Sequence, residues 1–360
     1  MDIKAEHKNG IKILKTIGAV VGDSALIFGA TVLLAAAFVM CVMFTLTHGP
    51  SEQAKYIFVN SCNETSALKF LPHWFLKDEE VFRLLSPTEE EGFDYYGFKK
   101  ETAVAEIDNE EAAASDASVV PEDDGYTDGI KIEDIGGETF RGKVMLIKDP
   151  ERVTIGVLPS YNGGGGKFLY KFIEEYGAIA GINGGGFADE EGKGNGGCPD
   201  GIVIKDGKIL FGSQGVIYNN VIGFDADHNL INGSFSPAGA ISAGMVEGFS
   251  FTMGNVLIKD GVEAVKLGGG YNPRAAIGQT EDGTVILLVI EGRTAASLGA
   301  TRDDLVRIMS DYGAVNASML DGGSSAEMRY NGEQLTRGSG PIGMRGLPDA
   351  ILVMPEGSGL

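Results

Sequence analysis

One pattern occurs twice in this chain, and it restricts the folds open to the C-terminal half. Residues 176–186 contain Tyr-Gly-Ala, a short apolar run, and an asparagine followed by three glycines. Residues 312–325 repeat this order, with Asp321 followed by two glycines and two serines. Each copy follows an amphipathic helix and predicts a glycine helix stop, a buried strand and a polar residue on a glycine-rich turn. Glycines have no side chain, so next to a fixed amide or carboxylate group they let an anionic or sugar-like ligand approach the main-chain N–H groups.

The region around these two turns is rich in strand and turn signals. Only eight of the 54 glycines precede residue 129, so the remainder of the chain has many tight turns. Thr301 and Asp304 predict a capping box at the start of the second helix. Two-residue hairpin signals occur at Asp206-Gly207, Asp260-Gly261, Asp282-Gly283 and Asn331-Gly332. We therefore expect an α+β fold: a strand-rich mixed sheet domain with a few packed helices, preceded by a single transmembrane helix.

The N-terminal region predicts that helix. Residues 25–46 form 22 consecutive residues without a charge, which is long enough to cross a bilayer. The run ends without a small-residue cleavage site, which favours an uncleaved anchor over a removed signal peptide. Lys4, Lys8, Lys12 and Lys15 precede it, so the positive-inside rule places the N-terminus in the cytoplasm. We expect a single-pass protein of the cell membrane with its C-terminal domain outside the cell.

Charge and composition divide the remaining chain. We expect a cytoplasmic tail (1–16), a transmembrane anchor (17–47), a juxtamembrane helical segment (48–86), an acidic flexible linker (87–128) and the C-terminal domain (129–360). The linker interpretation rests on residues 78–128, which carry 17 acidic and three basic side chains. The formal net charge is −21, and no basic stripe is present, so nucleic acid is excluded as a partner.

Two carboxylates follow apolar strands in the C-terminal domain. Asp321 and Glu291 therefore predict an acid/base pair, although each also fits a simple turn, Asp321 bonded to its own backbone and Glu291 paired with Arg293. Arg274 precedes another strand, where its guanidinium would suit a phosphate, or it is a surface residue. Ser324 is expected to donate hydrogen bonds. The four histidines form no metal spacing, and no Gly-x-Ser-x-Gly elbow supports a serine hydrolase.

Four ordered segments of residues 130–356 resemble the phosphodiester glycosidase family: 182–187 (Ile-Asn-Gly-Gly-Gly-Phe), 199–207 (Pro-Asp-Gly through Asp-Gly), 273–278 (Pro-Arg-Ala-Ala-Ile-Gly) and 320–325 (Leu-Asp-Gly-Gly-Ser-Ser). Known members include N-acetylglucosamine-1-phosphodiester α-N-acetylglucosaminidases and bacterial proteins linked to exopolysaccharide. The resemblance implies catalytic roles for Asp321, Glu291, Asn183 and Arg274. It implies substrate contacts at Gly184, Gly185, Gly186, Asp200, Arg293, Gly322, Gly323, Ser324 and Arg345.

The resemblance implies hydrolysis of a sugar joined through its anomeric oxygen to a phosphodiester. Together with the apolar N-terminal run, it predicts a membrane-anchored hydrolase that cleaves sugar-1-phosphodiester linkages in an anionic cell-surface glycopolymer. Two alternatives remain open at this point: a non-catalytic module that binds wall polymer or exopolysaccharide, and a metal-dependent phosphodiesterase. No cofactor is indicated with certainty. Calcium stays open because the turns are rich in oxygen ligands, but no ligand spacing requires it.

Overall fold

The first of three sheets, sheet A, has seven strands in the order β1-β2-β13-β12-β14-β10-β11. The computed structural model describes residues 3–65, 68–85, 125–189, 193–336 and 344–358. Helix α6 (Arg302–Asp311) covers one face of sheet A with Leu305, Ile308 and Met309. The strands are β1 (Ile130–Gly136), β2 (Arg141–Ile147), β10 (Val256–Lys259), β11 (Val262–Glu263), β12 (Arg274–Thr280), β13 (Val285–Ile290) and β14 (Ala314–Leu320).

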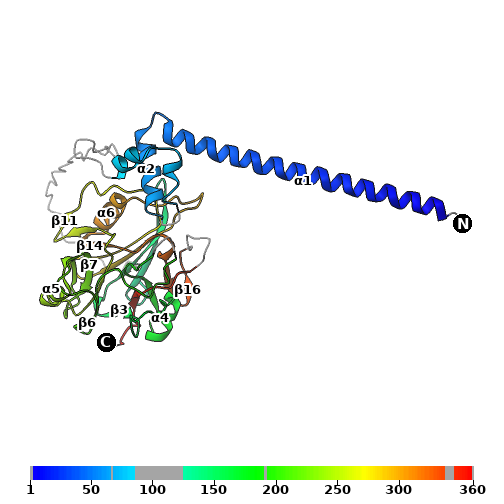
Figure 1. Cartoon of the computed structure of the whole chain (residues 1–360). Helices are drawn as coiled ribbons and strands as arrows, with labels where there is room; N and C mark the ends of the chain where they lie inside the picture. Colours follow the sequence, from blue (N-terminus) through cyan, green and yellow to red (C-terminus); the bar gives the residue numbers. More distant parts are fainter. Residues whose placement is uncertain (1–2, 66–67, 86–124, 190–192, 337–343, 359–360) are drawn as a thin grey trace, which may run out of the picture.

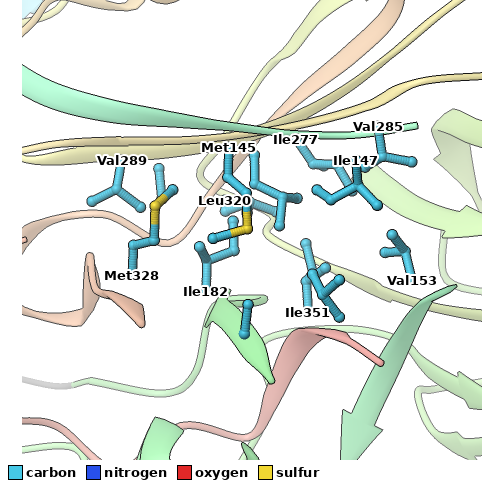
Figure 2. Close-up of a cluster of buried hydrophobic side chains, with 14 of the residues drawn as sticks. Met145, Ile147, Val153, Ile182, Ile277, Val285, Val289, Leu320, Met328 and Ile351 are labelled. Carbon is cyan, nitrogen blue, oxygen red and sulfur yellow. The ribbon is translucent and has the colours of Figure 1, made fainter. Parts of the chain in front are cut away.

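Sheet B lies against the other face of sheet A. Figure 2 shows the buried layer between them, with Leu320 and Met145 from sheet A facing Ile182 and Ile351 from sheet B. Helix α4 (Leu169–Tyr176) covers the outer face of sheet B through Leu169 and Phe172. The order of sheet B is β16-β15-β4-β17-β3, with β3 (Val153–Val157), β4 (Ala180–Asn183), β15 (Met328–Tyr330), β16 (Glu333–Gln334) and β17 (Asp349–Val353).

A third sheet, sheet C, closes the core at its end. Phe224 and Phe249 from this sheet join the layer between sheets A and B, and β7 and β8 contact β14. Helix α5 (Pro237–Ser242) packs beside it through Ala240. The order is β6-β5-β9-β7-β8, with β5 (Val203–Lys205), β6 (Lys208–Phe211), β7 (Tyr218–Phe224), β8 (Leu230–Phe235) and β9 (Glu247–Ser250).

These three sheets confirm the strand-rich α+β fold, but they differ from expectation in strand direction. Every pairing between the described strands is antiparallel. We expected a mixed sheet because two similar helix–strand units were assigned to it. In the structure, β4 belongs to sheet B and β14 to sheet A, so each unit finds antiparallel neighbours in a different sheet.

The N-terminal part is helical (Figure 1). Helix α1 (Ile3–His48) projects away from the sheets, and its portion Asp23–His48 is long and apolar enough to cross a membrane. An anchor and a signal sequence both have these properties. Helix α2 (Glu52–Asn63), a 3-10 turn η1 (Pro72–Trp74) and α3 (Asp78–Leu85) follow and share a small core that includes Val59 and Leu84. Nearly all of the predicted linker, residues 87–128, lies outside the described residues.

Candidate active site

The two repeated turns meet at one edge of the interface between sheets A and B. Asn183 ends β4, and its Nδ2 donates a hydrogen bond to the backbone oxygen of Asp321 over 2.6 Å. The backbone N–H of Asp321 in turn donates to the oxygen of Gly184 over 3.0 Å. Asn183 is fully buried, and its Oδ1 accepts from the N–H of Glu327. The asparagine therefore joins the two turns, while Asp321 stays half-exposed beside them.

Two further carboxyl groups lie against the glycine turn 184–186. Asp349 begins β17, and its Oδ1 accepts a hydrogen bond from the N–H of Gly185 over 2.6 Å. A Cβ atom on Gly184 would lie 2.2 Å from that oxygen, and one on Gly186 would lie 2.4 Å from Oδ2 of Asp200. Gly184 and Gly186 must therefore be glycines, because carboxyl oxygens of Asp349 and Asp200 lie too close to their backbone for a Cβ atom to fit.

Asp200 is held from the other side of this turn. Its N–H donates to the oxygen of Gly186, and its Oδ2 accepts from the N–H and the hydroxyl of Thr252 over 3.1 and 2.9 Å. Within the described residues, Oδ1 of Asp200 and Oδ2 of Asp349 are buried without a hydrogen-bond partner. A buried carboxyl oxygen without a donor favours the protonated group, which can then donate a hydrogen bond itself.

The three aspartates therefore share an environment that opposes negative charge. Burial raises the pKa of Asp349 to about 8, and the charges of Asp200 and Asp321 add to the shift. Burial likewise raises the pKa of Asp321 to about 7, against a hydrogen bond from Ser325 and with a contribution from Asp200. Burial also raises the pKa of Asp200, while hydrogen bonds from Thr252 oppose the change. The shifts of Asp321 and Asp349 place proton exchange by these two groups near neutral pH.

Two arginines approach the carboxyl groups. Arg345 donates from Nη2 to Oδ1 of Asp189 over 2.8 Å and lies 5.2 Å from the ring centre of Phe187. Its charge also lowers the pKa of Asp321, opposing the larger effect of burial. Arg293 is exposed and lies beside the second turn, because a Cβ atom on Gly323 would lie 3.3 Å from its Nη2. Both guanidinium groups thus lie within electrostatic reach of Asp321.

The backbone of this second turn is itself specialised. Gly323 has φ +57°, a left-handed conformation in which glycine is unstrained, and its N–H donates to the oxygen of Pro273. A Cβ atom on Gly322 would lie 2.7 Å from that same oxygen. Ser324 is half-buried within the short 3-10 turn that follows. The turn therefore packs directly against the beginning of β12.

Arg274 and Glu291 lie farther from the chemistry that the sequence assigned to them. Arg274 is buried at the start of β12, and its guanidinium contacts Glu64 at 2.6 Å rather than open solvent. Glu291 follows β13, and β12 lies between β13 and β14, which carries Asp321. Strands are spaced about 4.8 Å apart, so the backbones of Glu291 and Asp321 are separated by roughly 10 Å. Asp200 is the carboxyl that adds to the raised pKa of Asp321.

Asp349 was not among the site residues predicted from the sequence. Its only local signal is a polar residue at the start of an apolar strand, a pattern too common to single out. Glu64 and Thr65 were missed because they precede the C-terminal domain by more than 60 residues. Among the described residues, no group of three or more His, Cys, Asp or Glu side chains is arranged to hold a metal ion.

The raised pKa of Asp349 predicts an unusual dependence of stability on pH. An unfolded aspartate has a pKa of about 3.9, so between about pH 4 and 8 the folded protein retains a proton that the unfolded chain has lost. Stability contributed by this group is complete below about pH 4 and is lost as the pH rises through about 8. Asp349→Asn should therefore flatten the fall in unfolding free energy between pH 5.5 and 8.5, measured by urea denaturation. Equal slopes in the two proteins would contradict the assignment.

Comparisons with known proteins agree with this geometry. Residues 176–354 match the family model described as phosphodiester glycosidase. The catalytic domain of zebrafish N-acetylglucosamine-1-phosphodiester alpha-N-acetylglucosaminidase, auto-inhibited by its pro-peptide, has a similar structure, with a TM-score of 0.50 and 22% identity. That alignment covers 62% of this chain and 82% of the zebrafish domain.

Two other matches are more limited. A hypothetical protein from Synechocystis aligns with a TM-score of 0.44 and 17% identity, over 63% of this chain and 62% of that one. The SPbeta prophage-derived uncharacterized protein YomE of Bacillus subtilis (strain 168) is 38% identical over 64 residues, which are 18% of this chain and 10% of YomE. The family-model match includes β4 with its glycine turn, β12, β14 and β17, the elements that position Asn183, Asp321 and Asp349. Residues 176–354 of this chain therefore form a domain of the phosphodiester glycosidase family.

Proposed function

We propose that this domain hydrolyses the bond between the anomeric carbon of a sugar and the oxygen of a phosphodiester. The observation that carries the proposal is Asp321, a partly buried carboxyl with a pKa raised by burial to about 7, beside the exposed Arg293. A group that titrates near neutral pH can exchange protons during the reaction. A neighbouring guanidinium can bind the phosphate by paired hydrogen bonds.

The chemistry of the substrate explains why a carboxyl group and arginines would act together in this site. Cleavage of the C1–O bond sends its electron pair to a phosphate oxygen, and Arg293 and Arg345 would neutralise the charge that develops there. A phosphate is a good leaving group, so the reaction needs less protonation of the leaving oxygen than an ordinary glycoside does. Asp321 reacts as the carboxylate, either taking a proton from the water that attacks C1 or attacking C1 itself.

Asp200 and Asp349 support this reaction in different ways. Asp200 lies across the glycine turn with Oδ1 buried and Oδ2 bonded to Thr252, so it acts on Asp321 through its charge rather than through contact with the sugar. Asp349 is 1% exposed and holds the N–H of Gly185, so it fixes the backbone of the turn rather than touching substrate. Gly184–Gly186 are buried and their main-chain groups are hydrogen-bonded within the protein, so the partly exposed Gly322–Gly323 would supply the main-chain contacts to the sugar.

The cellular setting is also part of the proposal. The apolar portion of α1 would serve as a membrane anchor, with the lysines that precede it in the cytoplasm and the domain outside. The substrate would then be an anionic glycopolymer of the cell surface. The segment boundaries expected from the sequence, at residues 16, 47, 86 and 128, belong to this proposal as well.

Hydrolysis in labelled water tests the proposed bond cleavage. The full chain in detergent is incubated in H₂¹⁸O with an alkyl phosphodiester of N-acetylglucosamine in the α configuration. We expect free N-acetylglucosamine carrying the label, together with an unlabelled alkyl phosphate. Label in the phosphate would instead show P–O cleavage and favour the phosphodiesterase alternative. Retention of a labelled glycopolymer without any turnover would favour the binding module.

A further inference from the structure

A segment that precedes the C-terminal domain lies on the wall of the candidate site. This N-terminal segment, defined here as residues 51–65, consists of the cap Ser51, helix α2 and the two residues Glu64 and Thr65. The oxygen of the Ser61 side chain accepts a hydrogen bond from the N–H of Tyr271 over 3.0 Å. A Cβ atom on Gly270 would lie 2.2 Å from the backbone nitrogen of Ser61. Gly270, which precedes β12, therefore has no space for a side chain, because α2 lies directly against its backbone.

Glu64 ends this segment in a cluster of cations and amides. Its carboxylate contacts Nη2 of Arg274 at 2.6 Å and Nη2 of Arg302 at 3.0 Å. The side-chain amide of Asn272 donates to the same carboxylate over 2.8 Å. The Arg274 and Glu64 side chains are only 7% and 11% exposed. Glu64 thus fixes the orientation of Asn272 while it pairs with two arginines.

Thr65 continues this network to the exposed arginine. Nη2 of Arg293 donates to the hydroxyl of Thr65 over 2.9 Å and to Oδ1 of Asn272 over 3.2 Å. The Thr65 hydroxyl also lies 3.3 Å from that amide oxygen. In the described part of the chain, both of these hydrogen bonds of Arg293 use Nη2. Neither of them uses Nε or Nη1 of the guanidinium group.

The backbone of Arg293 adds a second sign of function. Its φ is +58°, a left-handed conformation that is uncommon for residues other than glycine. Strained backbone of this kind often occurs where a side chain must be aimed at a ligand. Partial desolvation lowers the pKa of Arg293, Arg274 adds to that lowering, and Glu64 and Asp321 oppose it. The guanidinium therefore lies within electrostatic reach of Asp321.

We propose that Thr65 and Glu64 are positioning residues of the phosphate-binding part of the site, with Thr65 holding the Arg293 guanidinium and Glu64 holding Asn272 behind it. The inference rests on the proposed function, and both residues lie outside the region that matches the family model, which begins at residue 176. A free arginine side chain loses considerable rotamer entropy when it binds an anion. Fixing it beforehand lowers this cost and tightens binding.

Replacement of the threonine hydroxyl tests the inference in the full-length protein. Thr65→Val keeps the shape of the side chain and removes the hydroxyl, and Thr65→Ser keeps the hydroxyl. For the N-acetylglucosamine phosphodiester, we expect Thr65→Val to lower kcat/KM roughly 10-fold, mainly through a higher KM, because a hydrogen bond to a charged group is lost. Thr65→Ser should restore KM and the melting temperature, while Thr65→Val should lower the melting temperature by about 2–4 °C, because the hydroxyl also donates to the backbone oxygen of Ser61 over 2.9 Å.

A double-mutant cycle separates positioning from a merely structural role. In an Arg293→Ala background, Thr65→Val should have no further effect on KM, because the side chain that it orients is gone. Independent effects of the two substitutions, or an unchanged KM in Thr65→Val, would overturn the inference. An increase in kcat/KM in Thr65→Val or Glu64→Gln would also overturn it, since the N-terminal segment would then obstruct the site.

Binding of inorganic phosphate, measured by isothermal titration calorimetry, distinguishes failure of this inference from failure of the proposed function. If the wild type does not hydrolyse the substrate but binds phosphate more tightly than Thr65→Val does, the anion site and its positioning residues stand without the glycosidase activity. If the wild type hydrolyses the substrate and Thr65→Val matches it in both assays, the glycosidase stands and the inference fails. Absence of both turnover and phosphate binding in the wild type would refute both.

Discussion

Replacing Asp321 with asparagine should lower kcat for sugar-1-phosphodiester hydrolysis by about 10²–10⁴-fold, the usual contribution of a group that transfers protons in the transition state. Asparagine has nearly the same shape and cannot become charged. Because burial raises the pKa of Asp321 to about 7, the neutral replacement should leave the protein at least as stable at pH 8. Loss of turnover together with an unchanged or higher melting temperature would identify a residue that acts in catalysis.

The matched control for this substitution is Asp206→Asn. Asp206 is exposed in the hairpin between β5 and β6, with φ +52°, and asparagine tolerates such a conformation. Initial rates with the phosphodiester substrate, measured beside thermal melting, should show wild-type behaviour for this control. Wild-type kcat in Asp321→Asn would remove the proposed role of the aspartate.

Replacing Glu64 with alanine should cost about 3–5 kcal/mol of unfolding free energy, the range found when one member of a buried ion pair is removed. The loss is large because Arg274 is almost completely buried and would keep its charge without a carboxylate partner. Arg302 would lose the same partner. Urea denaturation followed by circular dichroism measures the change.

Glu52→Ala provides the comparison within the same helix. Glu52 begins α2 and pairs with Lys55 and Arg83, but its side chain is 47% exposed. Exposed pairs of this kind contribute about 0–1 kcal/mol, because water screens the charges and ordering the side chains opposes the gain. Similar losses in the two variants would show that Glu64 is no more important to the fold than a surface pair. A fragment that begins at residue 129 lacks Glu64, so activity assays require a chain that retains the N-terminal segment.

Local signals in the sequence predicted the local structure. Each of the four turn signals joins paired strands, and Asp206, Asp260 and Asn331 adopt left-handed backbone before their glycines. The capping box between Thr301 and Asp304 is formed in both directions. These features depend on contacts within a few residues, and so they can be read from short stretches of sequence.

The sequence did not predict which sheet each strand joins. The two helix–strand units look equivalent in sequence, but β4 and β14 belong to opposite layers of the core. An apolar strand with a polar end residue fits either layer equally well. Which strands become its neighbours depends on packing of the whole core, which single-sequence patterns do not specify.

In the candidate site as well, the sequence predicted some residues and missed contacts between distant parts of the chain. Asn183 and Asp321 were identified because their turns repeat, and the structure joins them by hydrogen bonds across 138 positions of sequence. The partner of Arg274 is Glu64, 210 positions away just after a helix with no recognisable motif. Because that contact exists only in the folded protein, the sequence suggested a phosphate ligand or a surface residue for Arg274, which the structure buries in an ion-pair cluster.

The docking of α2 has a geometric consequence for the acidic stretch between α3 and β1. Residues near the end of α1, Met43 and Leu46, pack on the same small core as α2, and the N-terminal segment is bonded to β12 and its neighbours. Both ends of the acidic stretch are thus attached to a single packed body. The length of the stretch therefore does not set how far the domain would reach from a membrane. The short connection between α1 and α2 would set that distance.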